Sequence, residues 1–218
     1  MIEKKYLLTD DQIAQFITHG YVQLETDFSP EFHQLVVNKM SERVAFEGNP
    51  GNNLVPRVPE IQQIFDHPVI KGALTSVLGP NYVLHAHRHA HLRPGGERPE
   101  QGSSGNTFVP PDIRTGGWHK DNYWNNEKTR GHYPWSAMIF YFPQDVTEDM
   151  GVTGIMAGSQ YRYKLDYDKE INVPIVGKAG TFALISYDLW HRATANVSNI
   201  DRFMLKFIFF RLEAPQKP

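Results

Sequence analysis

The spacing of the apolar residues changes once along the chain, near residue 80, and this change constrains the possible folds more than any other feature. Before it, apolar residues recur at helical spacing, which predicts helices over residues 9–20, 29–40, 59–66 and 68–78. The first has capping-box spacing between Thr9 and Gln12, with Gly20 as its C-cap glycine. From Tyr82 onward, apolar and polar residues alternate, as on a β-strand.

Short strands account for most of the second half of the chain. The alternating segment that begins at Tyr82 extends to Leu92, and further strands are predicted over 135–142, 152–157, 171–176, 181–189 and 202–210. Lys178, Ala179 and Gly180 have the composition of a hairpin turn. Because the strands follow the helices without alternating with them, we expect a mostly β fold, an antiparallel sandwich or barrel with helices against it.

Composition narrows the classes of function. The 218 residues predict a single domain, helical over about residues 1–80 and β over about 81–218. Lys and Arg total 22 against 24 Asp and Glu, a net charge of -2, so no broad basic surface favours nucleic acid or an acidic membrane as a partner. No segment approaches the roughly 20 apolar residues of a membrane span, and residues 1–10 lack the apolar core of a signal peptide. A cytoplasmic protein is therefore expected; the sequence does not indicate its oligomeric state.

Metal ligands have to come from His, Asp and Glu, because the chain has no cysteine. His119 and Asp121 are two residues apart after a glycine-rich segment, and residues i and i+2 of an extended chain project to the same side. His191, which follows the apolar segment 181–189, is the expected third ligand. Two histidines and one carboxylate on one face of an octahedron leave three positions open, as non-haem Fe(II) oxygenases require.

Arg202 follows His191 at the start of the last predicted strand. A short loop between them would bring the guanidinium beside the metal, where its fixed set of donors suits a dicarboxylic acid. The 2-oxo acid end of such a molecule would fill two open metal positions and its far carboxylate would pair with Arg202. One metal position would remain for O2.

Four segments resemble the phytanoyl-CoA dioxygenase family of Fe(II)/2-oxoglutarate-dependent oxygenases, in the order in which that family carries them. They are an F...GYV.L run at 16–24, a WHKD run at 118–121, a GSQ run at 158–160 preceded by Gly151, and an H....N.S...R run made of His191, Asn196, Ser198 and Arg202. Together they cover nearly the whole chain.

The resemblance implies a double-stranded β-helix, a cupin-like jelly roll, with the N-terminal helices packed on one sheet. It also implies that His119, Asp121 and His191 bind Fe(II) and that Arg202 binds the C5 carboxylate of 2-oxoglutarate. The implied activity is oxidation of a C–H bond, usually hydroxylation, in a small-molecule substrate. That reaction uses O2 and converts 2-oxoglutarate into succinate and CO2.

One face of the strand that begins at Tyr82 carries four histidines, namely His85, His87, His89 and His91. By analogy with the family, His91 contacts 2-oxoglutarate, while His89 and His87 lie nearer the substrate. A polar inner wall whose imidazoles bond only to their neighbours is the structural alternative. A cupin-like metal site of His89, His91 and Glu97 is a weaker one, because Glu97 follows His91 later than that motif places it.

The segment 94–117 is rich in Gly, Pro and Ser and is longer than an ordinary connection, so we expect it to govern substrate choice. Several aromatic residues lie near His119 in the sequence, and a reactive iron centre has to be shielded from water. Among them Trp124 is the first candidate to line the pocket.

Two features favour a second hypothesis, a catalytically silent binding or regulatory module that keeps the metal site. Ala193 stands where relatives often carry a small hydroxyl residue that reaches 2-oxoglutarate, and Thr194 faces the other way on an extended chain. The segment between Gly158 and His191 is also shorter than in many relatives. A third hypothesis, a zinc- or manganese-dependent hydrolase or isomerase, uses the same three ligands and gives Arg202 no function.

Overall fold

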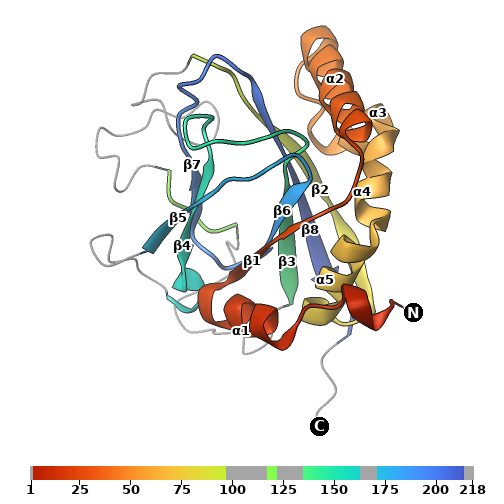
Figure 1. Ribbon diagram of the computed structural model, residues 1–218, viewed down its shortest axis with the longest axis vertical. Helices are drawn as coiled ribbons and strands as arrows, with labels where there is room; N and C mark the ends of the chain where they lie inside the picture. Colours follow the sequence, from red (N-terminus) through yellow and green to blue (C-terminus); the bar gives the residue numbers. More distant parts are fainter. Residues whose placement is uncertain (1, 97–116, 122–134, 163–170, 214–218) are drawn as a thin grey trace.

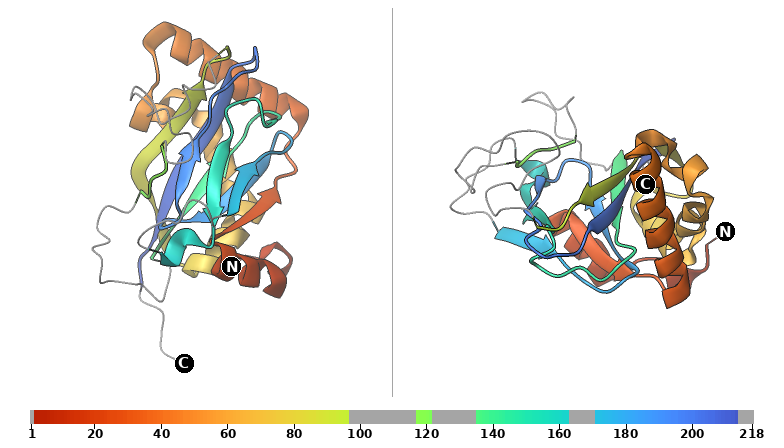
Figure 2. Two further views of the ribbon diagram at one scale, coloured as in Figure 1. Left: turned by 90° about the vertical axis from the view of Figure 1, so that its left-hand side faces the viewer. Right: turned by 90° about the horizontal axis from the view of Figure 1, so that it is seen from above.

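Two antiparallel sheets and a layer of helices form three successive layers in the computed structural model (Figure 1), which describes residues 2–96, 117–121, 135–162 and 171–213. Seen from above in Figure 2, the helices cover one face of the large sheet and the small sheet lies across its other face. This arrangement is the cupin-like jelly roll with helices packed on one sheet that the sequence predicts.

The first α-helix begins and ends where local capping chemistry predicts, whereas the second extends to Glu47, beyond its predicted end at residue 40. Thr9 accepts a hydrogen bond from the Gln12 N–H, and the Gln12 side chain accepts one from the Thr9 N–H. Gly20 ends that helix with a φ of 79°, in the left-handed region that glycine adopts without strain. The helical elements are η1 (Lys4–Tyr6), α1 (Asp10–His19), α2 (Pro30–Glu47), η2 (Gly51–Asn53), α3 (Leu54–Arg57), η3 (Pro59–Ile61), α4 (Gln62–Asp66), α5 (Pro68–Leu78) and η5 (Ser159–Tyr161).

The large sheet has the strand order β1-β6-β3-β8-β2 and the small sheet the order β5-β4-β7. In the large sheet these strands are β1 (Tyr21–Glu25), β2 (Tyr82–Arg93), β3 (Ser136–Tyr141), β6 (Thr181–Ser186) and β8 (Arg202–Arg211). The small sheet consists of β4 (Thr153–Ala157), β5 (Ile171–Ile175) and β7 (His191–Ala193). Strands distant in sequence lie side by side, because the chain crosses repeatedly between the sheets.

The sheets differ from the sequence prediction in the turn at residues 178–180 and in two strands that the sequence does not predict, β1 and β7. The helical N-terminal part also contributes β1, whose five residues are too few for their spacing to be distinctive and which is held as an edge strand by its pairing with β6. The turn at residues 178–180 is present, and the Thr181 N–H donates to the Lys178 carbonyl at 2.9 Å. It is not a hairpin turn, however. It joins β5 of the small sheet to β6 of the large one.

Alternation along β8 separates the two hydrophobic cores. Its odd-numbered residues, Phe203, Leu205, Phe207 and Phe209, pack with the helices. Met204 and Ile208 project from the opposite face into the core between the sheets. Any polar even-numbered residue of β8 therefore points into the jelly roll. Within the described residues, no helix is both long enough and apolar enough to cross a membrane.

Replacing Phe207 by alanine should destabilise the protein strongly, because its ring is fully buried and packs edge-on against Phe65 with ring centroids 4.4 Å apart. The expected loss is about 3–5 kcal/mol in the free energy of unfolding, measured by urea denaturation. Phe46→Ala is the matched control, since this ring is 83% exposed, and should change that free energy by less than about 0.5 kcal/mol. Equal losses in both variants would contradict the assignment of the core.

Candidate metal centre

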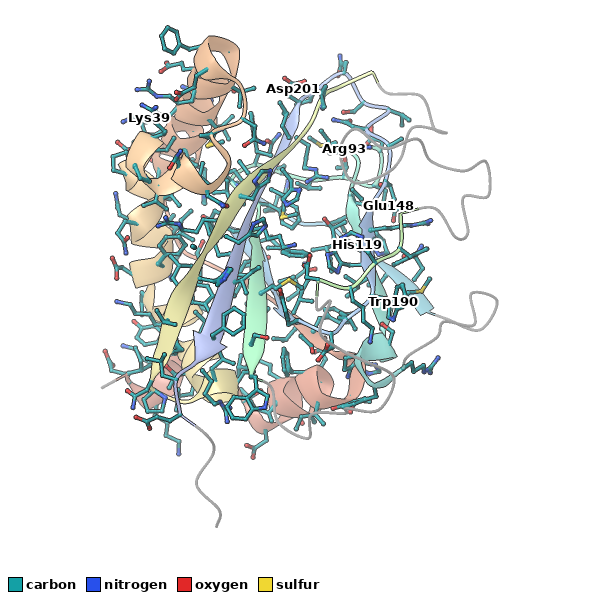
Figure 3. The ribbon with its side chains drawn as sticks, turned by 180° about the vertical axis from the view of Figure 1, so that it is seen from behind. Lys39, Arg93, His119, Glu148, Trp190 and Asp201 are labelled. Atoms are coloured by element: carbon teal, nitrogen blue, oxygen red, sulfur yellow. The ribbon has the colours of Figure 1, made fainter. Side chains whose placement is uncertain are left out.

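Backbone pairing places His119 opposite His191. The N–H of each residue donates to the carbonyl of the other at 3.0 Å, so the segment around His119 adds a short pairing to the edge of β7. Side chains opposite each other in an antiparallel pair lie on the same face, and the two imidazole centroids are 4.3 Å apart. Figure 3 shows His119 on the small-sheet side of the large sheet, whereas Lys39 lies on the helical side.

The three predicted ligands converge. Among the described residues, His119, Asp121 and His191 are the group that could hold a metal ion, with one ligand atom from each lying within 4.8 Å of the others. The Nδ1 of His119 is 2.8 Å from the Gly117 carbonyl, and the Nδ1 of His191 is 3.0 Å from the Leu189 carbonyl. A carbonyl only accepts hydrogen bonds, so Nδ1 carries the hydrogen in both rings and the Nε2 lone pairs are left for a metal.

Asp121 is held by a buried cation that the sequence analysis did not identify. Its Oδ2 lies 2.5 Å from the Nζ of Lys206 and 3.4 Å from the Nε2 of His191. Burial by itself raises the pKa of Asp121, but the interactions with His191 and Lys206 together outweigh burial and lower the pKa below its usual value. The carboxylate is thus ionised and available as a ligand at neutral pH.

His191 is a neutral imidazole in this environment. Burial and the neighbouring His119 together lower its pKa to about 3. The Phe140 ring packs against it with centroids 5.4 Å apart, which shields this side of the site from water. A neutral, buried imidazole with its Nε2 toward a carboxylate is the protonation state that metal binding needs.

Arg202 lies on the same inner wall but outside the three-residue cluster. It is fully buried, its Nη2 donates to the Gly151 carbonyl, and its Nε is 3.4 Å from the Met150 carbonyl. Its neighbour across the strands is Arg93 of β2. Two carbonyls thus fix the guanidinium in the interior, four residues along β8 from Lys206.

Three histidines of β2 form a row of neighbouring rings, in which His87 stacks on His89 and His89 meets His91 edge to face. Ring centroids are 5.8 Å apart between His87 and His89 and 4.9 Å apart between His89 and His91, whereas His85 is exposed and lies against Phe210. A bulge between Leu84 and Arg88 interrupts the pairing with β8 without moving the later histidines to the other face.

His91 pairs across the sheet with Met204, which lies between Arg202 and Lys206 on β8. Burial lowers its pKa well below the usual value, and the nearby charges of Lys206 and Arg202 act in the same direction. Its Nε2 is buried and has no hydrogen-bond partner within the described part of the chain. Such an atom can donate to or accept from a bound molecule without displacing a protein partner.

The other segments of the family resemblance support this wall structurally. Ser159 accepts a hydrogen bond from the Trp190 N–H at 3.1 Å and so fixes the residue before His191. Asn196 is fully buried and donates to the carbonyls of Arg93 and Ile200, which closes the turn that leads into β8. These contacts fix the segments that precede His191 and Arg202, whose side chains are buried.

The missing hydroxyl at position 193 has a substitute across the sheet. Thr194 donates its hydroxyl to the Val152 carbonyl at 3.0 Å and is thereby occupied, as its position beside Ala193 predicts. Thr153 pairs directly with Ala193, is buried, and therefore presents a hydroxyl on the face that Ala193 shares. Only the pairing of β4 with β7 brings these two positions together.

Some predicted site residues lie outside the described residues, namely Trp124, Glu97 and most of the segment 94–117. Lys206 is the residue that sequence reasoning missed. The available signal was its spacing, since it follows Arg202 by two strand repeats on a segment whose other face is apolar throughout.

A jelly roll with two histidines and one carboxylate on its inner wall is the arrangement of non-haem iron, 2-oxoglutarate-dependent oxygenases. The family model described as phytanoyl-CoA dioxygenase (PhyH) matches residues 21–204. The chain therefore belongs to the phytanoyl-CoA dioxygenase family, and it is an Fe(II)- and 2-oxoglutarate-dependent oxygenase, as predicted.

Solved structures with low sequence identity share the fold. EctD from S. alaskensis with bound Fe has a TM-score of 0.72 at 16% identity, over 95% of this chain and 82% of that one. The epimerase SnoN, in complex with Fe3+, alpha ketoglutarate and nogalamycin RO, has a TM-score of 0.72 at 14% identity, over 96% and 86%. The carbocyclase SnoK from nogalamycin biosynthesis has a TM-score of 0.70 at 16% identity, over 93% and 84%. Comparison with curated protein sequences found no match.

Acid should destabilise the metal-free protein, because His33, His91 and His191 are buried with lowered pKa values. The unfolded chain binds protons on these rings below its ordinary histidine pKa of 6.5, while folded His191 does so only near 3. Their contribution to stability is therefore complete above pH 6.5 and is lost as the pH falls. Each ring adds up to about 1.4 kcal/mol per pH unit.

Urea denaturation of chelator-treated protein at pH 7, 6 and 5 measures this slope. His191→Asn should make it shallower, because the variant removes one of the titrating rings. A free energy of unfolding that does not change between pH 7 and pH 5 would contradict the buried, neutral state of these histidines.

Proposed function

We propose that this chain oxidises a C–H bond of a small-molecule substrate, with His119, Asp121 and His191 binding Fe(II), and with Arg202 and His91 binding 2-oxoglutarate. The observation that carries the proposal is the convergence of the three ligand atoms within 4.8 Å of one another on the wall that also carries Arg202. Small-molecule substrates are typical of the family. The cytoplasmic location expected from the sequence stays a prediction.

The donor set fits a divalent iron ion. Two imidazole Nε2 atoms and one carboxylate oxygen face one another, and each ring is oriented by a backbone carbonyl on its Nδ1. Nitrogen and oxygen ligands of this kind suit Fe(II), and three protein ligands leave coordination positions for other molecules. When bound, iron would supply the oxidising chemistry by activating O2, which oxidises both 2-oxoglutarate, to succinate and CO2, and the substrate.

The chain's own residues fix the reactants and exclude water. Arg202 offers a guanidinium held by two carbonyls in a fully buried position, which suits the far carboxylate of 2-oxoglutarate. The free Nε2 of His91 and the hydroxyl of Thr153 offer further polar contacts along the cosubstrate. Phe140, Met204 and Ile208 line the interior with apolar atoms, so the bound molecules meet little water.

Anaerobic titration with Fe(II) and then 2-oxoglutarate tests the proposal, because a chelated 2-oxo acid gives a visible charge-transfer band. We expect the band in the wild type and none in His191→Ala, which lacks a metal ligand. Arg202→Met should weaken 2-oxoglutarate binding by about tenfold or more, since it removes a charge-assisted contact.

Arg57→Met is the matched control, because the Arg57 side chain is half exposed and pairs with Glu47 at the surface. It should leave the affinity for 2-oxoglutarate unchanged. Absence of the band from folded wild-type protein would contradict the proposed function, and unchanged affinity in Arg202→Met would contradict the role of that residue.

Succinate formation in air distinguishes an active enzyme from the second hypothesis, the catalytically silent binding module. With Fe(II) and 2-oxoglutarate present, the wild type should form succinate continuously. Asp121→Ala and His119→Ala should reduce the rate to background, because each removes a metal ligand. Succinate is measured by chromatography. A wild-type rate no higher than the background rate of the two variants would favour the silent module.

A further inference from the structure

Lys206 is a buried cation for which the proposed metal and cosubstrate roles provide no lasting partner. Its side chain is 6% exposed, and its Nζ lies 5.8 Å from the centre of the Phe140 ring and 2.5 Å from the Oδ2 of Asp121. Burying an ammonium group is costly unless an anion or several acceptors compensate it. Within the described residues, Asp121 is the carboxylate that forms an ion pair with Lys206.

The position of Lys206 on β8 places it beside the reaction centre. It pairs across the sheet with His89 of β2 on one side and with Phe140 of β3 on the other, so its side chain shares the inner face with both. Arg202 lies two strand repeats away on the same face. The inner face of β8 therefore carries two buried cations, Lys206 beside Asp121 and Arg202 four residues away along the strand.

Among the described residues, the charges of the loaded site leave Lys206 no carboxylate that it does not share with the metal. By the function proposed above, a divalent metal is coordinated by Asp121. One carboxylate of 2-oxoglutarate binds that metal, and the other pairs with Arg202. Metal and Lys206 then share a single protein carboxylate. A further anion next to Lys206 would restore the balance, and the remaining molecule in the site is the substrate.

We propose that the primary substrate is a carboxylate and that Lys206 binds its carboxylate group, an inference that rests on the function proposed above. In the metal-free protein Asp121 holds the ammonium in place. In the loaded protein the substrate carboxylate becomes its partner, which positions the rest of the molecule on the side of His87 and His89. A neutral analogue of the same shape leaves the buried ammonium uncompensated and is rejected.

Binding of small probe acids tests this without turnover. Protein loaded with Zn(II), which is redox-inert, and saturated with 2-oxoglutarate is titrated with benzoate, phenylacetate and hexanoate and with the three corresponding primary amides. Ligand-observed NMR gives the affinities. Wild type should bind the carboxylates about tenfold or more tightly than the amides, because a charge-assisted contact is gained.

Two variants at the same position assign the preference. Lys206→Met keeps the length of the side chain without its charge and should bind acids and amides equally. Lys206→Arg keeps the charge and should retain the preference. Lys178→Met is the matched control, since Lys178 is exposed and pairs with Asp145 on the surface, and it should behave as wild type.

Three results would overturn the inference. Wild type without a preference for acids would do so, and this comparison needs no variant if Lys206→Met fails to fold. A preference that survives in Lys206→Met would show that the acids bind the metal or another cation. A greater loss of 2-oxoglutarate affinity in Lys206→Met than in Arg202→Met would assign Lys206 to the cosubstrate. Failure of wild type to bind 2-oxoglutarate, measured first, contradicts the proposed function itself.

Discussion

The site depends on one reciprocal backbone pairing, in which the N–H of His119 and the N–H of His191 each donate to the other residue's carbonyl. The two histidines are 72 positions apart in the sequence, and this pairing brings their segments side by side. The pairing fixes both Cα positions, and the carbonyls of Gly117 and Leu189 then fix the ring orientations through Nδ1. Two nitrogen ligands are thus preorganised by main-chain groups before any metal binds, which reduces the conformational cost of binding.

The last strand joins the two halves of the fold and sets the charge of the interior. Its phenylalanine face packs against the helices, where Phe207 meets Phe65. Its other face carries Arg202 and Lys206 between apolar residues of the core shared by the two sheets. The same alternation that anchors the helices therefore delivers two cations to the reaction chamber. Asp121 forms an ion pair with Lys206. By our proposals, 2-oxoglutarate is the counter-ion of Arg202, and an acidic substrate is the counter-ion of Lys206 in the loaded protein.

Much of this was predictable because local rules and short motifs are read directly from the chain. The capping residue Thr9, the alternation from Tyr82 and the spacing of His119 and Asp121 all correspond to observed features. The strand β1 was not predictable in this way, since its pairing with β6 holds it in the sheet. The relation of Thr153 to Ala193 was hidden for the same reason, because strand register is not encoded locally.

The sequence by itself determined the fold class, the family and the residue types at the candidate metal centre. Hydrophobic periodicity and the order of the motifs can be recognised in the sequence without knowledge of contacts. Only the tertiary structure decided which polar residues share the interior with them. In the sequence, Lys206 is one of several even-numbered residues of a predicted strand. Only the folded chain shows that its ammonium group contacts Asp121. His91 likewise becomes a free donor or acceptor only when packing removes its Nε2 from water. Charge compensation and burial are properties of residues brought together in space, and they are set by the whole fold.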